Sequence, residues 1–446
     1  MKDMLKSAAY QALNYALKSG AEVEVYAGSH RKLQIEVAQG RVETLKEAAE
    51  AGLGIRIVNS GRLGFAYTSD LKPSALRETV DTALQTSGYM SADPHLNLTP
   101  AGLIYPRLDT YDAEINRHPI EEKTALAQQA EKMARAADRR ISMVERSGYE
   151  ENEFGVAIVN SRGVDVYERG NYCSLYLYTL AEQDGDAQGG FASMSRRSYI
   201  DLDPERVAGE AACRALRSLK ARGMGSKKLP CVFEPYVAVK LLGLLARMAD
   251  AEAVFKGKSL LADKVDRSIA AECFSVLDDA TLDGGLATFP FDDEGVPAQR
   301  HILIDRGRLK GFLYDNQAAH RAGLPSTGHA RRMSFRSLPS ISPSNLIIQA
   351  GNMEDKKMVG DLPEGLYVTD LMGLHTANPV SGDFSLGAAG ILIQKGQLTH
   401  PVRGLVIAGN MIEMLQNIDA VGTEVRFFGS RGAPGLRVAS LSVAGS

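Results

Sequence analysis

The feature that most constrains the fold is the stretch 370–422, in which short apolar segments alternate with glycine-rich turns. Its hairpin ILIQKGQLTH, which starts at Ile391, matches turn for turn the hairpin ILIDRGRLKGFLY, which starts at Ile302. Gly396 can supply the positive φ that a two-residue hairpin turn requires. Many short strands of this kind predict a sandwich or a closed, barrel-like sheet in the C-terminal half.

The N-terminal region carries a different pattern. Apolar residues recur at helical spacing from Leu5 to Leu17, which predicts an amphipathic first helix and not a targeting segment. In the next segment, Leu33, Ile35 and Val37 alternate with polar residues, as is typical of an antiparallel sheet with one covered face. Strands are predicted at 21–26, 32–37, 53–58 and 62–67, and a helix at 73–85.

The order of elements then repeats. Residues 87–117 are rich in Pro, Asp and Asn and are interpreted as a connection. Asp203 is placed to act as the N-cap of a helix that starts at residue 204. The repetition can reflect an internal duplication of a unit of helix, sheet and helix, or helix-start signals that arose independently in two unrelated segments. The second unit is predicted to contain a helix at 120–138, strands at 141–146, 153–160, 164–168, 174–180 and 191–199, and a helix at 204–220.

The length of 446 residues is too great for one ordinary core. The glycine-containing, basic segment ARGMGSKK at 221–228 predicts a boundary between domains 1–225 and 226–446. A helix at 235–255 is apolar nearly all round, which indicates a buried helix. The predicted fold class is α+β, with an N-terminal two-layer α/β domain whose sheet is largely antiparallel. The C-terminal domain is predicted to be β-rich and barrel-like, built around the buried helix.

Charge and cysteine content limit the classes of function. A net charge of −3 and the lack of an aromatic and basic stripe argue against direct binding to nucleic acid. The four cysteines are scattered without a CxxC pair, which favours a reduced cytoplasm, buried thiols and no thiolate metal site. No transmembrane segment is predicted, because charged residues interrupt the longest apolar stretch.

Three groups of residues are candidates for binding. The acidic run Asp292, Asp293 and Glu294 can hold a cation or a substrate amine, or form a solvated turn. The loop TGHARR carries donors that can grip a carboxylate or a peptide backbone, or lie on the surface. A glycine-rich loop can line a site or serve only as tight turns. The candidates in the two loops are His329, Arg331 and Arg332, and Gly382, Gly387 and Gly390.

The eight histidines do not form a recognisable metal motif. None has a second histidine at i+4 or i+5 on a predicted helix, which a metalloprotease helix requires. His320 and His329 can converge across the loop between them or lie in solvent. From the residues alone we therefore predict no catalytic residue and no metal ligand.

Several ordered motifs resemble the TldD/PmbA family, once called modulators of DNA gyrase. They are FPFDDEGVPAQRHILIDRGRLKGFLYD from Phe289, STGHARR from Ser326, NPVSGDFSLGAAGILIQKGQLTHPVRGLVIAGNM from Asn378, and NIDAVG from Asn417. The resemblance covers the C-terminal half and, more loosely, the N-terminal region. It implies an N-terminal α/β domain, a β-rich C-terminal domain, and dimers that enclose a cavity where unfolded peptides are cut.

The family has two branches, and the resemblance favours one of them. TldD-type members carry HExxxH on a helix, which together with a C-terminal cysteine implies a zinc peptidase. Taking FKGKS from Phe255 as the anchor, that motif falls at residues 244–249, which read LLARMA and offer no zinc ligand. Residues 423–435 contain no cysteine. Both features resemble the PmbA (TldE) branch, the partner subunit without its own zinc.

Three functions are compatible with these observations. The first is a subunit that forms cavity wall and substrate grip in a heterodimer with a zinc-bearing TldD-like metalloprotease, and that forms a homodimer when its partner is missing. The second is an independent binding or regulatory protein, the idea behind the gyrase-modulator name. The third is a self-sufficient peptidase whose site is built from His320, His329 and the acidic run 292–294.

Overall fold

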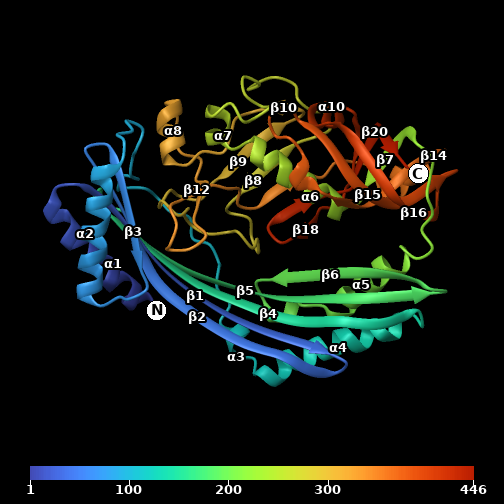
Figure 1. Cartoon of the computed structure of the whole chain (residues 1–446), viewed down its shortest axis with the longest axis horizontal. Coiled ribbons are helices and arrows are strands. Elements are labelled where there is room, and N and C mark those ends of the chain that lie inside the picture. The colour runs from blue at the N-terminus through green and yellow to red at the C-terminus, as the bar shows by residue number, and fades with distance from the viewer. Residues whose placement is uncertain (446) are drawn as a thin grey trace.

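The computed structural model describes residues 1–445 and shows an α+β architecture, as predicted (Figure 1). The N-terminal region forms one six-stranded antiparallel sheet, sheet A, with the strand order β3-β2-β1-β4-β5-β6. Sheet A curves into a half-barrel, and one of its faces is turned toward the C-terminal region. Its strands are β1 (Glu22–Ala38), β2 (Arg41–Asn59), β3 (Arg62–Thr68), β4 (Ile141–Asn160), β5 (Asp165–Gln183) and β6 (Asp186–Arg196).

Helices cover the opposite face of sheet A. Two apolar clusters lie beneath them, one under α1 and α2 and the other under α4 and α5. The predicted N-cap is confirmed, because the Asp203 carboxylate accepts a hydrogen bond from the backbone N–H of Arg206 at 2.9 Å. The helical elements of this region are α1 (Lys2–Ala16), η1 (Leu17–Ser19), α2 (Pro73–Tyr89), α3 (Glu114–Arg117), α4 (Ile120–Ala137), η2 (Tyr199–Asp201) and α5 (Pro204–Leu216).

Several strands that were predicted as two separate segments are continuous in the structure. The segments predicted at 21–26 and 32–37 are both part of β1, those at 141–146 and 153–160 are both part of β4, and those at 164–168 and 174–180 are both part of β5. Gly28 illustrates the reason. A glycine between two apolar segments is locally typical of a turn, but Gly28 pairs with Gly52 on one side and Val156 on the other. The ladders to β2 and β4 on its two sides hold the segment around this glycine extended.

The order helix, three strands, helix occurs twice in sheet A and its helices. The first unit is α1-β1-β2-β3-α2 and the second is α4-β4-β5-β6-α5. The two units meet in the middle of the sheet, where β1 pairs with β4. The repeated order agrees with the predicted pattern, while an origin by duplication stays a prediction.

The C-terminal region contains a closed barrel. The strand order β16-β15-β14-β7-β20 closes because β16 also pairs with β20, and β17 extends the sheet beyond β20. A second six-stranded sheet has the order β10-β9-β8-β13-β19-β18. These strands are β7 (Lys227–Phe233), β8 (Val276–Asp279), β9 (Arg300–Asp305), β10 (Arg308–Leu309), β13 (Leu346–Ile348), β14 (Glu364–Met372), β15 (Asp383–Gln394), β16 (Gln397–Asn410), β17 (Ile418–Val421), β18 (Arg426–Phe428), β19 (Arg431–Ala433) and β20 (Leu436–Ala444).

The two similar hairpins turn in the same way. Arg306 and Gly307 join β9 to β10 with φ of 44° and 76°, and Lys395 and Gly396 join β15 to β16 with φ of 52° and 72°. Two consecutive positive φ values are the pattern of the tight hairpin turn, so the predicted conformation of Gly396 is confirmed. The remaining C-terminal elements are α7 (Ala251–Phe255), α8 (Asn316–Ala322), β11 (Ala330–Arg331), β12 (Ser340–Ile341), α9 (Asp355–Gly360), η3 (Leu374–Thr376) and α10 (Met411–Gln416).

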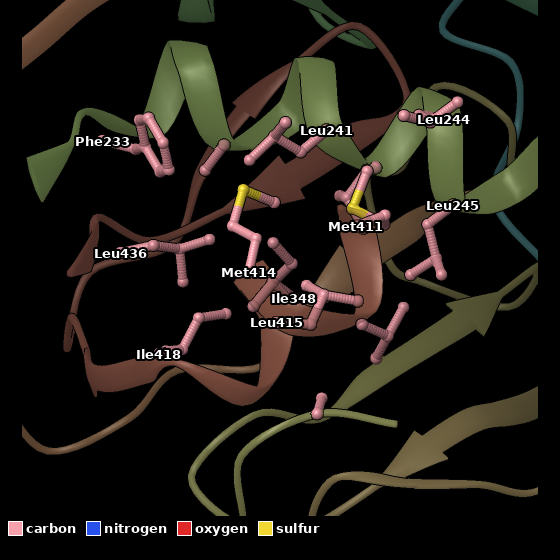
Figure 2. Packing of buried hydrophobic residues seen from close by; sticks show 14 of the residues in the cluster. Phe233, Leu241, Leu244, Leu245, Ile348, Met411, Met414, Leu415, Ile418 and Leu436 are labelled. Atoms are coloured by element: carbon pink, nitrogen blue, oxygen red, sulfur yellow. The ribbon is translucent and has the colours of Figure 1, made fainter. Parts of the chain in front are cut away.

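Helix α6 (Pro235–Met248) forms the centre of the C-terminal core. Leu241 and Leu245 pack with Met414 of α10 and Ile348 of β13 (Figure 2). The single helix predicted at 235–255 is wrong in one respect, because it is broken after α6. The carboxylate of Asp250 accepts the N–H of Glu252 and starts the separate helix α7. Within residues 1–445, no helix is both long and apolar enough to cross a membrane.

Candidate functional site

The acidic run predicted to touch substrate lies inside the molecule. Asp292 and Glu294 are each 1% exposed. Asp292 accepts the backbone N–H of Glu294 at 3.0 Å and of Val296 at 2.9 Å through one oxygen, and that of Ala330 at 3.1 Å through the other. Burial, and then the charge of Glu294, raise the pKa of Asp292. This carboxylate therefore organises the backbone of two loops.

Four buried charges join sheet A to the C-terminal region, and we call them the junction network. Arg56 of β2 binds Glu24 of β1 at 2.8 Å and Glu294 at 2.5 Å, and Arg332 binds Glu24 at 2.6 Å. Burial alone would lower the pKa of Arg56, but the two glutamates together raise it. The two arginines and two glutamates balance each other, and each arginine reaches across the boundary between the regions.

Three of the predicted residues, Asp293, Arg331 and Arg332, line a cavity of about 400 Å³, which we call the aromatic cavity. Asp293 and Arg331 line it together with Phe154, Phe289 and Phe335. The Asp293 carboxylate accepts a backbone N–H at 2.6 Å from the residue after Arg331. Among the ion pairs of residues 1–445, Arg331 takes part in none, so its guanidinium can serve a ligand.

His329 is a buried structural residue in this fold. Its ring is 2% exposed, and its nitrogens lie 3.0 Å from Asp278 and 2.7 Å from the hydroxyl of Thr327. The ring of His301 lies 5.7 Å away, centroid to centroid. His320 lies instead beside His95, at 5.8 Å. In residues 1–445, no group of three or more His, Cys, Asp or Glu side chains is arranged to hold a metal ion.

The glycine-rich loop is shaped by close packing. Gly382 has a φ of +80°, and an added Cβ would lie 2.3 Å from a methyl group of Leu260. At Gly390 an added Cβ would lie 2.5 Å from the carbonyl oxygen of Tyr367, whereas at Gly387 the nearest atom is 3.5 Å away. A positive φ favours glycine at 382, and a tight backbone contact requires it at 390.

Gly390 also lines a second cavity, of about 510 Å³, which we call the strand-edge cavity. It lies between residues 188–191 of β6 and the barrel, and Arg217 and Tyr236 contribute to its wall. β6 is the last strand of sheet A and is paired only with β5. Arg217 binds both carboxylate oxygens of Glu234 at 2.8 Å. Of the nine predicted site residues, three line the aromatic cavity, Gly390 lines the strand-edge cavity, and five line neither.

The two segments in which the resemblance expects zinc ligands meet in space. Residues 244–249 comprise the last turn of α6 and the residue after it, and all of them are buried except Arg247. Leu245 points into the apolar core (Figure 2). Arg431, from the second segment, places its guanidinium over α6 at Gly243, where an added Cβ would lie 2.6 Å from Nη1. An apolar core and two arginines do not fit a zinc ion.

Half of the junction network, Glu24 and Arg56, was not predicted from the sequence, and neither were Arg217 and Tyr236 in the wall of the strand-edge cavity. Glu24 and Arg56 left a signal, because each interrupts an apolar strand, in EVEVY and GIRIV. A charged residue in a buried strand has to be paired. Arg217 and Tyr236 left no comparable signal, since both lie on helical segments whose neighbours only the tertiary fold supplies.

Comparison with known proteins places the whole chain in one family. Residues 226–445 match the PmbA/TldA metallopeptidase C-terminal domain, residues 114–219 the central domain, and residues 23–87 domain 1. Metalloprotease PmbA of Escherichia coli O157:H7 is 31% identical over 437 residues, covering 95% of this chain and 92% of that protein. A metalloprotease TldD homolog of Haemophilus influenzae is 26% identical over 390 residues, covering 83% and 79%.

Solved structures share the fold over nearly their full length. A putative modulator of DNA gyrase from Thermotoga maritima superposes with a TM-score of 0.90 at 26% identity, covering 98% of this chain and 99% of that one. TldE from Thermococcus kodakarensis superposes with a TM-score of 0.91 at 24% identity, covering 98% and 100%. The domain matches, the relatives and the shared architecture agree, and the chain belongs to the PmbA/TldD metallopeptidase family.

Proposed function

We propose that this chain is the PmbA/TldE-like subunit of a two-subunit zinc metalloprotease that degrades or matures unfolded or leader-bearing peptides. The chain contributes cavity wall and substrate grip, and a TldD-like partner carrying HExxxH contributes the zinc. The observation that carries the proposal is the strand-edge cavity, which lies between the two regions and is bordered by a strand with one unpaired edge.

An extended peptide suits this cavity, because it can add its backbone to the edge of β6. Gly189 helps, since it has no side chain beside that edge and an added Cβ there would meet nothing closer than 3.9 Å. Pairing through main-chain groups selects an extended backbone and places few demands on side chains. This accounts for a protease that accepts unfolded peptides of varied sequence.

The residues of this chain divide into two groups in the proposal. Asp293, Arg331 and Gly390 line cavities and remain candidates for peptide contact. Buried partners occupy the predicted grips Asp292, Glu294, His329 and Arg332, so we assign these four residues to holding the fold. The arginines near residues 244–249 support the assignment of zinc to the partner, since they repel a cation.

The proposal includes a heterodimer with the TldD-like subunit, a homodimer when that subunit is missing, and a location in the cytoplasm. The four cysteines are free; the prediction of buried thiols is confirmed for Cys173 and Cys231 and is wrong for Cys213 and Cys273, which are exposed. Exposed free thiols agree with a reducing compartment.

The test is digestion of an unfolded protein by this chain, by the HExxxH-bearing relative from the same genome, and by their mixture. We expect zinc-dependent cleavage by the mixture above that of the relative alone, and no cleavage by this chain alone. Chelator-sensitive cleavage by this chain alone would overturn the proposal and support a self-sufficient peptidase. A mixture no more active than the relative would favour an independent binding protein.

A further inference from the structure

One face of α6 is only partly buried, and we call it the α6 stripe. Every residue of α6 is buried except Tyr236, Lys240, Gly243 and Arg247. Their spacing of four, three and four residues places them in one line along the helix. Tyr236 lines the strand-edge cavity, so the stripe leads away from that cavity toward Arg247.

The charges along the stripe are balanced at the cavity end only. Lys240 forms an ion pair with Asp370, and Arg214, which stacks on Tyr236, binds Glu210. At the far end, Arg247 and Arg431 take part in no ion pair among residues 1–445. The end of the stripe therefore carries two positive charges without a carboxylate.

A glycine in α6 leaves the space that Arg431 occupies. Glycine in the interior of a helix costs about 1 kcal/mol relative to alanine. Gly243 occupies such a position, and the guanidinium of Arg431 fills the space that a side chain there would need. Arg247 is held nearby, donating to the carbonyl oxygen of Leu374 at 3.2 Å. Partial burial of its guanidinium, and then the charge of Arg247, lower the pKa of Arg431, and the two like charges repel each other when no anion is bound.

We propose that Arg247 and Arg431 bind the C-terminal carboxylate of a peptide that extends along the α6 stripe from the strand-edge cavity. A carboxylate accepts two parallel hydrogen bonds from a guanidinium and neutralises the repulsion between the two arginines. Tyr236 and Arg247 are eleven residues apart, a rise of about 16 Å, which about five residues of extended peptide span. This inference rests on the proposed function, because it names the end of the peptide that the chain would hold.

The test measures binding of labelled six-residue peptides to the purified chain by fluorescence anisotropy. The peptides have the same apolar sequence and end in either a free carboxylate or an amide. A hydrogen-bonded charge contributes about 1.5–3 kcal/mol, so we expect the acid to bind at least about tenfold more tightly than the amide. Arg431→Gln and Arg247→Gln should each remove most of this preference.

Two further variants separate a binding role from a structural one. Gly243→Ala changes no charge but displaces the Arg431 guanidinium, so it should also weaken binding of the acid. Arg41→Gln removes an exposed arginine at the start of β2, far along the chain from the stripe, and should change nothing. Thermal unfolding of each variant confirms that it is folded.

Several outcomes would overturn the inference. Equal affinity for acid and amide would do so, and so would a preference that survives Arg431→Gln. Inorganic phosphate is expected to compete only weakly; if micromolar phosphate binds while the acid binds no better than the amide, the site belongs to small anions and not to peptide ends. Cleavage by the two-subunit mixture is measured separately, so loss of the acid preference with cleavage intact would reject this inference and leave the proposed function standing.

Discussion

The junction network and the α6 stripe both depend on arginine but differ in how its charge is balanced. In the junction network, Arg56 and Arg332 are almost fully buried and lie against two glutamates. At the end of the stripe, Arg247 and Arg431 lie near each other without an acidic partner in residues 1–445. The first arrangement can be stable without a ligand, whereas the second is completed by an anion from outside the chain.

The difference follows from the cost of burying charge. A buried guanidinium without a partner loses its hydration and gains nothing in return, so interior arginines need carboxylates at hydrogen-bond distance. An exposed arginine keeps its hydration and tolerates a neighbour of like charge at a small cost. Uncompensated charge can therefore persist only where solvent or a ligand reaches it, and this distinguishes a structural arginine from a candidate binding residue.

The largest expected effect is at the junction. Arg56→Ala leaves Glu294 buried without an arginine and Glu24 with Arg332 alone, and we expect a loss of about 3–5 kcal/mol in the free energy of unfolding. Urea denaturation measures it. Arg41→Ala, on the same strand but exposed, should change the stability by less than about 0.5 kcal/mol. A loss below about 1 kcal/mol in Arg56→Ala would show that the glutamates find other partners and that the network is not what joins the regions.

The next prediction concerns pH, which should change the stability of the interior but not the charge of the stripe. Burial, and then the neighbouring His329, lower the pKa of His301 to about 4 from 6.5. Because the folded pKa is the lower one, the unfolded chain binds a proton first as the pH falls below 6.5. Stability that is present above pH 6.5 is then lost progressively down to pH 4, by up to roughly 3 kcal/mol.

Comparison with His301→Phe isolates this contribution. We expect the pH dependence of the unfolding free energy between pH 4 and 6.5 to be shallower in the variant, because phenylalanine does not titrate. Identical slopes in the two proteins would mean that the ring of His301 reaches solvent in the folded state. Titration of the stripe is not expected in this range, since arginine keeps its proton.

Much of the fold could be predicted from the sequence because local signals and tertiary structure agree. The turn at Gly396, the N-cap at Asp203 and the apolar pattern of α6 each depend on a few neighbouring residues. The length of β1 could not be predicted, because Gly28 is a turn signal locally and only its two neighbouring strands keep it extended. The division into domains 1–225 and 226–446 stays a prediction.

The candidate site was harder to predict than the fold. The acidic run and His329 were recognised as chemically unusual, but their burial depends on loops more than 30 residues away in sequence, as with Asp292 and Ala330. A single sequence does not show whether a carboxylate faces solvent or a backbone N–H. The stripe went unnoticed because Gly243 and Arg431 are unremarkable alone and acquire meaning only through their contact.

A smaller effect is expected at Gly243, where binding and stability oppose each other. Gly243→Ala should raise the free energy of unfolding by about 0.5–1 kcal/mol, because alanine is the better helix former and Arg431 is free to move outward. Urea denaturation of the variant, without peptide, measures the gain. A loss of stability instead would mean that the Arg431 guanidinium packs on the helix as part of the fold, and the stripe would then resemble the junction.

The smallest effect is expected at Arg247 itself. Arg247→Gln keeps the hydrogen-bonding capacity of the side chain but removes one of the two like charges, so stability should stay the same or rise by a few tenths of a kcal/mol. The gain should shrink as salt is added from about 0.05 M to about 0.5 M, because salt screens repulsion between exposed charges. Lys240 lies on the same face of α6 as Arg247 but pairs with Asp370 of β14. Lys240→Gln should therefore lower the stability slightly instead of raising it. If both variants lost stability equally, Arg247 would have a partner that balances its charge, and the contrast between the stripe and the junction would not hold.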